Sequence, residues 1–351
     1  MQFDLEAILS NNSIKVSIMT QPFVAKKTRI EYIDLAKGFC IVLVIANHLA
    51  MDMNFRLPFA EYLVTFRMPL YFFLSGCFFK TYEGFWGFTK RKINKLLVPF
   101  VFFYLTISCL IPRLAVDFFG AKWYCLPYSK FLTGFCTTGD GFPFGAIWFL
   151  LGLFIMNLIF YALHILASKT KYNIPVLIAG AILTIVLNQV FHDHLWFFVR
   201  SAFRNLLFFE FGYIAYRKTP IMKPNKLDKY LIFQIILAFA LLVVIKDYCP
   251  DKYIVYYACG LLGLYGVLML AKLLKHLPFF SYIGRYSIML LVTHMLLLRI
   301  GLDILQHFSL PISVVFVIVL VATLASYYAI IPFMLRFMPR VTAQKDLIKV
   351  S

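Results

Sequence analysis

Apolar runs of about 20 residues recur along this 351-residue chain, and they constrain its fold more than any other feature. A run of this length with few charges spans the hydrocarbon core of a bilayer as an α-helix. With 62% hydrophobic and only 14% charged residues, the chain is far more apolar than a soluble domain. We therefore predict an all-α, polytopic transmembrane bundle of about ten helices. The predicted helices lie at 36–53, 59–80, 95–112, 144–168, 173–191, 196–217, 229–247, 253–275, 279–298 and 312–338.

The excess of basic residues is predicted to orient these helices. In a soluble protein, a net charge of +18 would suggest a nucleic acid or another polyanion as partner. Here most of the 34 Lys and Arg residues fall in alternate connecting segments, which share one side of the bilayer. Such segments stay in the cytoplasm. The bias predicts that both termini are cytoplasmic, that the protein is a multi-pass protein of the inner (plasma) membrane, and that no nucleic acid is a partner.

One membrane domain is predicted over 29–340, between cytoplasmic tails at 1–28 and 341–351. The first tail lacks the charged, apolar and cleavage regions of a signal peptide. The seven cysteines show no metal-binding spacing, and the HDH triplet at 192–194 is too short for a metal site, so no metal is expected. Cys125 and Cys136 share the longest outer loop, where the sequence leaves a disulfide open.

The first helix carries polar residues that a simple membrane anchor does not need. Its sequence DLAKGFCIVLVIANH begins with Asp34 and Lys37 and ends with His48. Eleven residues at about 100° each bring Lys37 and His48 onto one face, about 16 Å apart along the axis. Asp34 lies one turn before Lys37 and can pair with it. This stripe predicts a polar cavity that runs partway through the membrane, with a histidine suited to general-base chemistry.

Further ionisable residues lie inside the predicted spans, where each is a functional candidate because burying it is costly. Arg67 precedes Pro69 in FRMPLYFFLSG, where the proline predicts a kink and Ser75-Gly76 allows close helix packing. Arg200 and Arg204 are one turn apart and need an anionic or polar neighbour between them. Ion pairing, for example of Arg204 with Glu210, is the alternative structural interpretation.

Two other basic motifs are open to more than one interpretation. The run KRKINKLLVP at 90–99 is predicted to lie in an inner loop before the third helix. It is either a plain orientation signal or a phosphate cradle at a helix start. In the ninth predicted helix, Arg285 and His294 are nine residues apart, which places them on opposite faces of a straight helix.

These motifs together resemble the acyltransferase-3 family of integral-membrane acyltransferases. The resemblance covers 29–294 and rests on a basic residue, ten residues and a histidine, here Lys37 to His48. It also rests on FRMPLYFFLSG, KINKLLVP, AIWFL at 146–150 and IGRYSIMLLVTH at 283–294, which follow in family order. Many members have arginine at the first position. The lysine here resembles the subgroup related to fucose 4-O-acetylases.

The resemblance implies transfer of an acetyl or other short acyl group from cytoplasmic acyl-CoA to a hydroxyl of a cell-surface or exported carbohydrate. Acetyl-CoA would be a co-substrate, and no tightly bound cofactor is expected. His48 would act as general base or carry the acyl group transiently, with Lys37 and Asp34 at the inner end of the channel. The implied substrate-binding residues are Arg67, Trp148, Arg200, Arg204, Arg285 and His294. The implied donor-phosphate-binding residues are Arg91, Lys92 and Lys95.

Transport is the alternative function that the buried charges also suit. A polytopic transporter or flippase of a glycan or lipid-linked sugar would need a polar cavity lined by arginines as well. The two functions differ in what a defective mutant exports. Loss of an acyltransferase leaves a glycan without ester-linked acyl groups, whereas loss of a transporter removes the surface glycan altogether.

Overall fold

The protein is described from a computed structural model, which covers residues 30–82, 84–138, 145–219 and 226–349. Contacts divide the chain into Met1–Ile30 and Glu31–Ser351, and the description below concerns the second unit. The predicted tail at 1–28 lies outside the described residues. The α-helices are α2 Glu31–Asp52, α3 Ala60–Cys77, α4 Gly84–Lys92, α5 Val98–Phe103, α6 Ile111–Phe119, α7 Trp148–Ser168, α8 Asn173–Val190, α9 Phe197–Lys218, α10 Leu231–Tyr248, α11 Lys252–Leu274, α12 Pro278–Arg285, α13 Ser287–Leu305 and α14 Ile312–Phe337.

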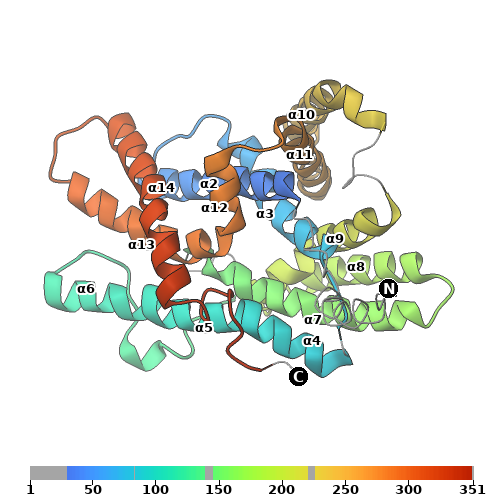
Figure 1. The fold of residues 1–351 in the computed structure, drawn as a ribbon, viewed down its shortest axis with the longest axis horizontal. Coiled ribbons are helices and arrows are strands. Elements are labelled where there is room, and N and C mark those ends of the chain that lie inside the picture. The colour runs from blue at the N-terminus through green and yellow to red at the C-terminus, as the bar shows by residue number, and fades with distance from the viewer. Residues whose placement is uncertain (1–29, 83, 139–144, 220–225, 350–351) are drawn as a thin grey trace, which may run out of the picture. The chain divides into compact units, whose positions relative to one another are not determined.

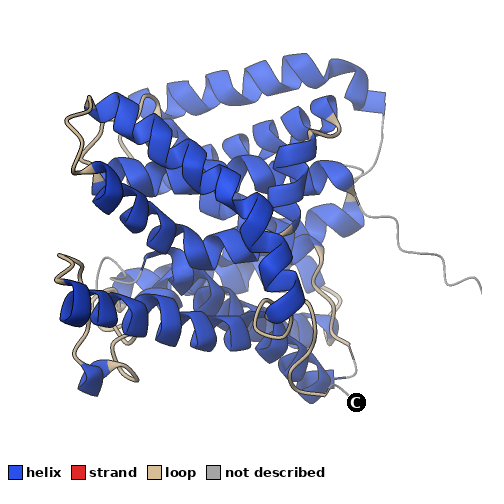
Figure 2. Ribbon diagram, turned by 60° about the vertical axis from the view of Figure 1, so that its left-hand side comes forward, coloured by secondary structure: helices blue, strands red, loops and turns tan. Residues whose placement is uncertain are grey.

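The described chain is helical almost throughout, and loops make the remaining connections (Figures 1 and 2). Short 3-10 turns occur at Tyr128–Lys130, Gly145–Ile147 and Lys226–Tyr230, and one isolated bridge joins Thr138 to Trp196. A helix occupies each of the ten predicted positions, so the prediction of an all-α polytopic bundle is confirmed. Within the described residues, eight helical segments are long and apolar enough to cross a bilayer. The other two predicted spans, α3 and α9, are more polar.

Helices α3 and α9 pack against each other at unusually short range. A Cβ atom on Gly76 of α3 would overlap the backbone carbonyl of Phe209, and one on Gly212 of α9 would overlap that of Phe73. Small residues at a helix interface let two backbones approach closely, which confirms the packing expected for Ser75-Gly76. Because they cover each other in this way, the polar helices α3 and α9 bury Arg67, Arg200 and Glu210 inside the bundle.

A second close contact joins α2 to α12, which cross in Figure 1. Gly38 of α2 faces the backbone of Phe280, and Gly284 of α12 faces the backbone of Asp34. The prediction of a single helix at 279–298 is wrong, because the helical backbone breaks at Tyr286, which has φ −108° and ψ 23°. The short helix α12 therefore packs on the start of α2, and α13 leaves in a different direction.

The basic run at 90–99 lies inside a helical segment that extends from Gly84 to Phe119, so its prediction as a loop is wrong. Two stretches of this segment are π-helical, η1 Ile93–Leu97 and η2 Tyr104–Leu110. Pro99 follows η1 and Pro112 follows η2. A proline removes one backbone donor and clashes with the carbonyl of the preceding turn, so a wider π turn accommodates each of them. Such π turns are frequent at functional sites.

Candidate functional site

The largest group of predicted site residues gathers around one cavity of about 490 Å³. We call it the basic cavity, because Lys37 of α2, Arg91 and Lys92 of α4, and Lys95 of η1 all line it. The structure thus brings Lys37 together with the three predicted donor-phosphate residues. Four cations around one cavity would repel one another, and an anionic ligand would relieve this repulsion.

Aromatic rings and backbone groups position these cations. The Arg91 guanidinium lies over the ring of Tyr82 at 4.6 Å, and the Lys92 ammonium lies 5.3 Å from the ring centroid of Phe88. The hydroxyl of Tyr71 donates a hydrogen bond of 3.0 Å to the backbone carbonyl of Lys37. Cation–π contacts hold a charged group against an apolar wall without neutralising it, and here they place the Arg91 and Lys92 side chains at the wall of the cavity.

Sequence reasoning missed several polar residues in the basic cavity. Tyr71, Ser75, Asn157 and Ser287 also line it. Asn157 of α7 is buried, and its amide donates a hydrogen bond of 2.7 Å to the carbonyl of Leu153. The Oδ1 atom of Asn157 has no hydrogen-bond partner among the described residues. The lone amide in the apolar stretch GLFIMNLIF was a usable sequence signal, because a buried polar group needs a partner or a ligand.

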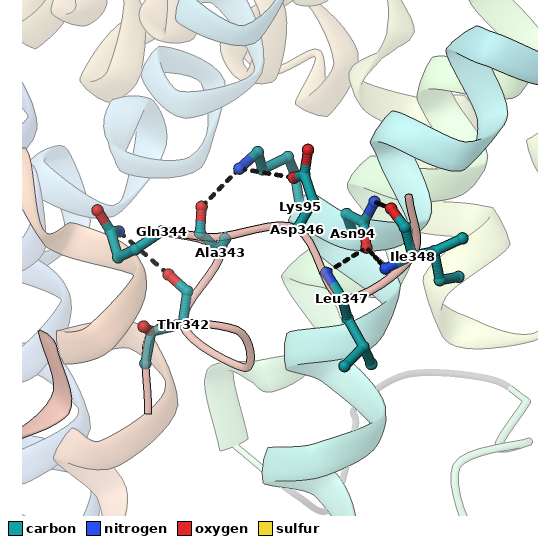
Figure 3. Close-up of polar contacts among 8 residues, drawn as sticks. All are labelled: Asn94, Lys95, Thr342, Ala343, Gln344, Asp346, Leu347 and Ile348. Carbon is teal, nitrogen blue, oxygen red and sulfur yellow. Dashed lines mark hydrogen bonds and ion pairs between the residues drawn. The ribbon is translucent and has the colours of Figure 1, made fainter. Parts of the chain in front are cut away.

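The end of the chain folds back onto η1 (Figure 3). Asn94 is fully buried, and its Oδ1 accepts hydrogen bonds of 3.0 Å from the backbone of Leu347 and 2.8 Å from Ile348. Its Nδ2 donates a further bond of 2.8 Å to the carbonyl of Ile348. One side chain thereby anchors the end of a tail that the sequence predicted only as a separate cytoplasmic segment.

Lys95 connects this tail to the basic cavity. Its ammonium donates a hydrogen bond of 2.8 Å to the carbonyl of Ala343 and lies 3.1 Å from a carboxylate oxygen of Asp346 (Figure 3). Both Lys95 and Asp346 are well exposed, so this ion pair is exchangeable. An anion in the cavity would compete with Asp346 for the same cation.

A pair of histidines lies further along α2. The ring of His48 faces the ring of His294 on α13, with centroids 5.4 Å apart and a tilt of 45°. Neither histidine lines the basic cavity, whose lining on these two helices extends to Ile41 and Leu291. Ile41 is two turns before His48, about 10 Å along the axis, and Leu291 is one turn before His294. The histidine pair therefore lies one to two helical turns beyond the residues of α2 and α13 that line the cavity.

Arg67 lies close to this pair. It is buried, and its Nη1 donates a hydrogen bond of 2.9 Å to the carbonyl of Leu43 on α2. Leu43 lies five residues before His48, about 7.5 Å along the axis of α2. The Nε atom has no hydrogen-bond partner among the described residues. The arginine thus contributes a positive charge and a spare donor to the region of the histidine pair.

The remaining predicted residues lie elsewhere. Asp34 is buried, with one carboxylate oxygen 4.0 Å from Nε of the half-exposed Arg285. Arg285 and His294 therefore contact different neighbours. Trp148 packs edge-on against Phe197, with ring centroids 5.3 Å apart. These side chains pair helices of the bundle and do not line the basic cavity.

The two arginines of α9 differ in burial and in their contacts. Arg200 is buried and hydrogen-bonds His192, whose other ring nitrogen is 2.7 Å from Asp193. Arg204 is exposed and stacks on the ring of Tyr256 at 3.6 Å. The alternative interpretation, an ion pair of Arg204 with Glu210, is wrong, since both carboxylate oxygens of Glu210 are buried without a hydrogen-bond partner in the described part of the chain.

Neither a disulfide nor a cluster of metal ligands is found in the described residues. Cys125 and Cys136 are both free thiols. No group of three His, Cys, Asp or Glu side chains in the described ranges could hold a metal ion. The candidate site therefore consists of the basic cavity and the histidine pair, joined by the stripe of α2 that carries both Lys37 and His48. Together they offer an anion-binding cavity and two nitrogen bases.

Comparison of the sequence with known protein families gives a match. The sequence model of a family described as an acyltransferase domain, acyltransferase-3, matches residues 30–340 of the 351. The match spans every residue of the basic cavity and both histidines. No curated protein and no solved structure matches the chain significantly.

Proposed function

Since the chain belongs to the acyltransferase-3 family, we propose that it moves an acetyl or other short acyl group from acyl-CoA to a carbohydrate hydroxyl. Acetyl-CoA is the proposed donor, and a cell-surface or exported glycan is the proposed acceptor. The lysine at position 37 supports an acceptor class like that of the fucose 4-O-acetylase subgroup. In this proposal the donor is cytoplasmic, because the basic segments of the chain are expected on that side.

The basic cavity is the proposed donor site, and the gathering of Lys37, Arg91, Lys92 and Lys95 around one cavity is the observation that carries the proposal. Acyl-CoA carries phosphates at one end and a thioester at the end of a long, thin arm. Lysine and arginine are the side chains that bind phosphate most effectively. The apolar and polar lining toward Ile41 and Leu291 suits the arm and directs it along α2.

The histidine pair is the proposed transfer site. His48 lies about 16 Å from Lys37 along α2, a distance that an extended pantetheine arm spans. His48 acts there either as the general base or as the transient acyl carrier. Arg67 supplies positive charge where the oxygen of the thioester carbonyl becomes negative in the transition state. Burial excludes water, which would otherwise hydrolyse the donor.

The test compares the surface glycan of cells that carry the wild type or His48→Ala. We expect wild-type cells to show ester-linked acetyl signals in the proton NMR spectrum of the glycan. The His48→Ala cells should export the same amount of glycan without these signals. If the variant also loses the glycan itself, the protein is a transporter, and the proposed acyl transfer is wrong. Protein levels in the membrane must be equal in both strains.

A further inference from the structure

The backbone fixes the tautomer of His294. The residue is fully buried, and its Nδ1 lies 2.8 Å from the carbonyl oxygen of Leu290, one turn earlier in α13. Because a carbonyl oxygen only accepts hydrogen bonds, Nδ1 must carry the ring proton. The other ring nitrogen, Nε2, therefore carries a lone pair and is the basic atom of the ring.

This basic nitrogen has no partner in the part of the chain that the structure describes. A buried acceptor without a hydrogen bond destabilises the folded protein, so native proteins rarely leave one without a partner. A ligand hydroxyl would satisfy Nε2 by donating its hydrogen. The chemistry of the atom therefore points to an alcohol as its natural partner.

The surroundings hold His294 in place. The hydroxyl of the preceding residue, Thr293, donates a bond of 2.7 Å to the carbonyl of Met289 and lies 3.0 Å from the hydroxyl of Tyr327. Tyr327 belongs to α14 and is fully buried, so this contact pins α13 against a neighbouring helix. A reacting group that is held in this way pays little to reach its productive geometry.

Two cavities meet at the turn of α13 that precedes His294. Leu291 lines the basic cavity, and it also lines a second pocket of about 30 Å³ together with Met295 and Arg299. The second pocket has room for about one or two water molecules, so it admits an acceptor hydroxyl but not a whole sugar ring. The rings of His48 and His294 lie in contact just beyond it.

We propose that the two histidines divide the reaction: His48 carries the acyl group, and His294 is the base that deprotonates the acceptor hydroxyl. This inference rests on the proposed acyltransferase function and assigns to His294 a catalytic role in place of substrate binding alone. The two rings that perform these steps are in contact with each other, with centroids 5.4 Å apart.

The proposed steps balance without any further reactant. A ring nitrogen of neutral His48 attacks the thioester carbon, so that a C–N bond forms and the C–S bond breaks. The proton lost from the His48 ring goes to the departing sulfur. The acceptor hydroxyl oxygen then attacks the same carbon, forming a C–O bond as the C–N bond breaks. The hydroxyl proton passes to Nε2 of His294 and from there to the released nitrogen of His48.

The test uses His294→Asn, in which the amide keeps an N–H donor for the Leu290 carbonyl but has no basic nitrogen. Membranes of the producing cells, which contain the natural acceptor, are incubated with acetyl-CoA that carries a radiolabelled acetyl group. We expect transfer to glycan to fall by about 10²–10⁴-fold, the usual contribution of a general base. The label should instead accumulate on the protein, be released by hydroxylamine, and be absent when His48→Asn is added.

The matched control is His164→Asn, the same change at a half-buried histidine of α7 whose Nδ1 is 3.4 Å from the Tyr213 hydroxyl. It should transfer label within about twofold of the wild type. The proposal is overturned if His294→Asn keeps full transfer, or if transfer is lost without label on the protein. If His294→Asn fails to accumulate in the membrane, His294→Gln answers the same question. A wild type that transfers no label would instead contradict the proposed function.

Discussion

The two ends of the stripe on α2 differ in openness and in charge. At the Lys37 end, four cations surround a cavity of about 490 Å³, and Lys95 is exposed. At the His48 end, two imidazole rings are in contact, and His294 has no exposed surface. An open, cationic cavity suits a large anion that must arrive and leave. A buried pair of imidazole rings suits a step from which water must be excluded.

In the proposed function, this difference assigns donor binding to the Lys37 end of α2 and acyl transfer to the His48 end. If so, substitutions at the two ends should change different kinetic constants. A residue of the basic cavity binds substrate and transition state alike, so its loss raises the KM for the donor. A residue near the histidine pair acts only in the transition state, so its loss lowers kcat.

The largest effect is expected for Arg67→Gln, which removes the buried positive charge that bonds to Leu43, five residues before His48. Loss of one preorganised donor to a developing oxyanion typically costs about 10²–10³-fold in kcat. The KM for acetyl-CoA should stay within about threefold, because Arg67 does not line the basic cavity. Steady-state rates of CoA release from purified protein measure both constants. Arg67→Lys, which retains the charge, should recover part of kcat. A changed KM with unchanged kcat would break the separation.

Lys92→Glu tests the basic cavity by reversing one of its four charges. The substitution removes one attractive charge-assisted contact to phosphate and puts a repulsive carboxylate in its place. We therefore expect the KM for acetyl-CoA to rise about 100-fold. The value of kcat at saturating donor should change less than about threefold. Lys90→Glu is the matched control, because Lys90 lies two residues away and does not line the cavity. An equal effect in both variants would mean that general surface charge, not the cavity, binds the donor.

Lys37 gives a smaller and more discriminating test. Lys37→Ala should raise the KM for acetyl-CoA about tenfold, the loss of a single charge-assisted contact. Lys37→Arg should restore binding, since a guanidinium binds phosphate with two parallel hydrogen bonds. Isothermal titration with CoA separates this binding effect from turnover. A Lys37→Arg protein that binds CoA no better than Lys37→Ala would show that Lys37 positions a neighbour and does not contact the phosphates.

The fold was largely predictable because the length of an apolar run determines whether a helix spans a bilayer. The register of Lys37 and His48 was predictable as well, because helical geometry alone fixes it. The break in the helix at Tyr286 was not predictable, since no proline lies there. The close approach of Gly284 to Asp34 depends on another helix, α2, which is distant in the sequence. For the same reason, the straight-helix argument gave no hint that His294 faces His48.

The contacts of the tail show the other limit of sequence reasoning. Asn94 and Ile348 are separated by 254 positions, and the Asn94 side chain bonds to backbone groups of Ile348, which leave no pattern in the sequence of the tail. The π turn that presents Asn94 and Lys95 follows from the position of Pro99, but its consequence for the cavity depends on tertiary packing. The cations of the candidate site were identified from the sequence. The structure was needed to show that Asp346 of the tail binds one of them, Lys95.

The smallest effect is expected for Asp346→Asn, which removes the internal carboxylate beside Lys95. The donor no longer has to displace a charged partner, so the KM for acetyl-CoA should fall about threefold, in line with the weakness of exposed ion pairs. The value of kcat should not change, because Asp346 contacts Lys95, which lines the basic cavity, and makes no described contact with either histidine. Lys345→Asn is the control, since Lys345 neighbours Asp346 in the tail but is not among the described polar contacts of Lys95, which are with Ala343 and Asp346. A fall in kcat for Asp346→Asn would mean that the tail also supports the transfer step, and the separation of binding from chemistry would fail there.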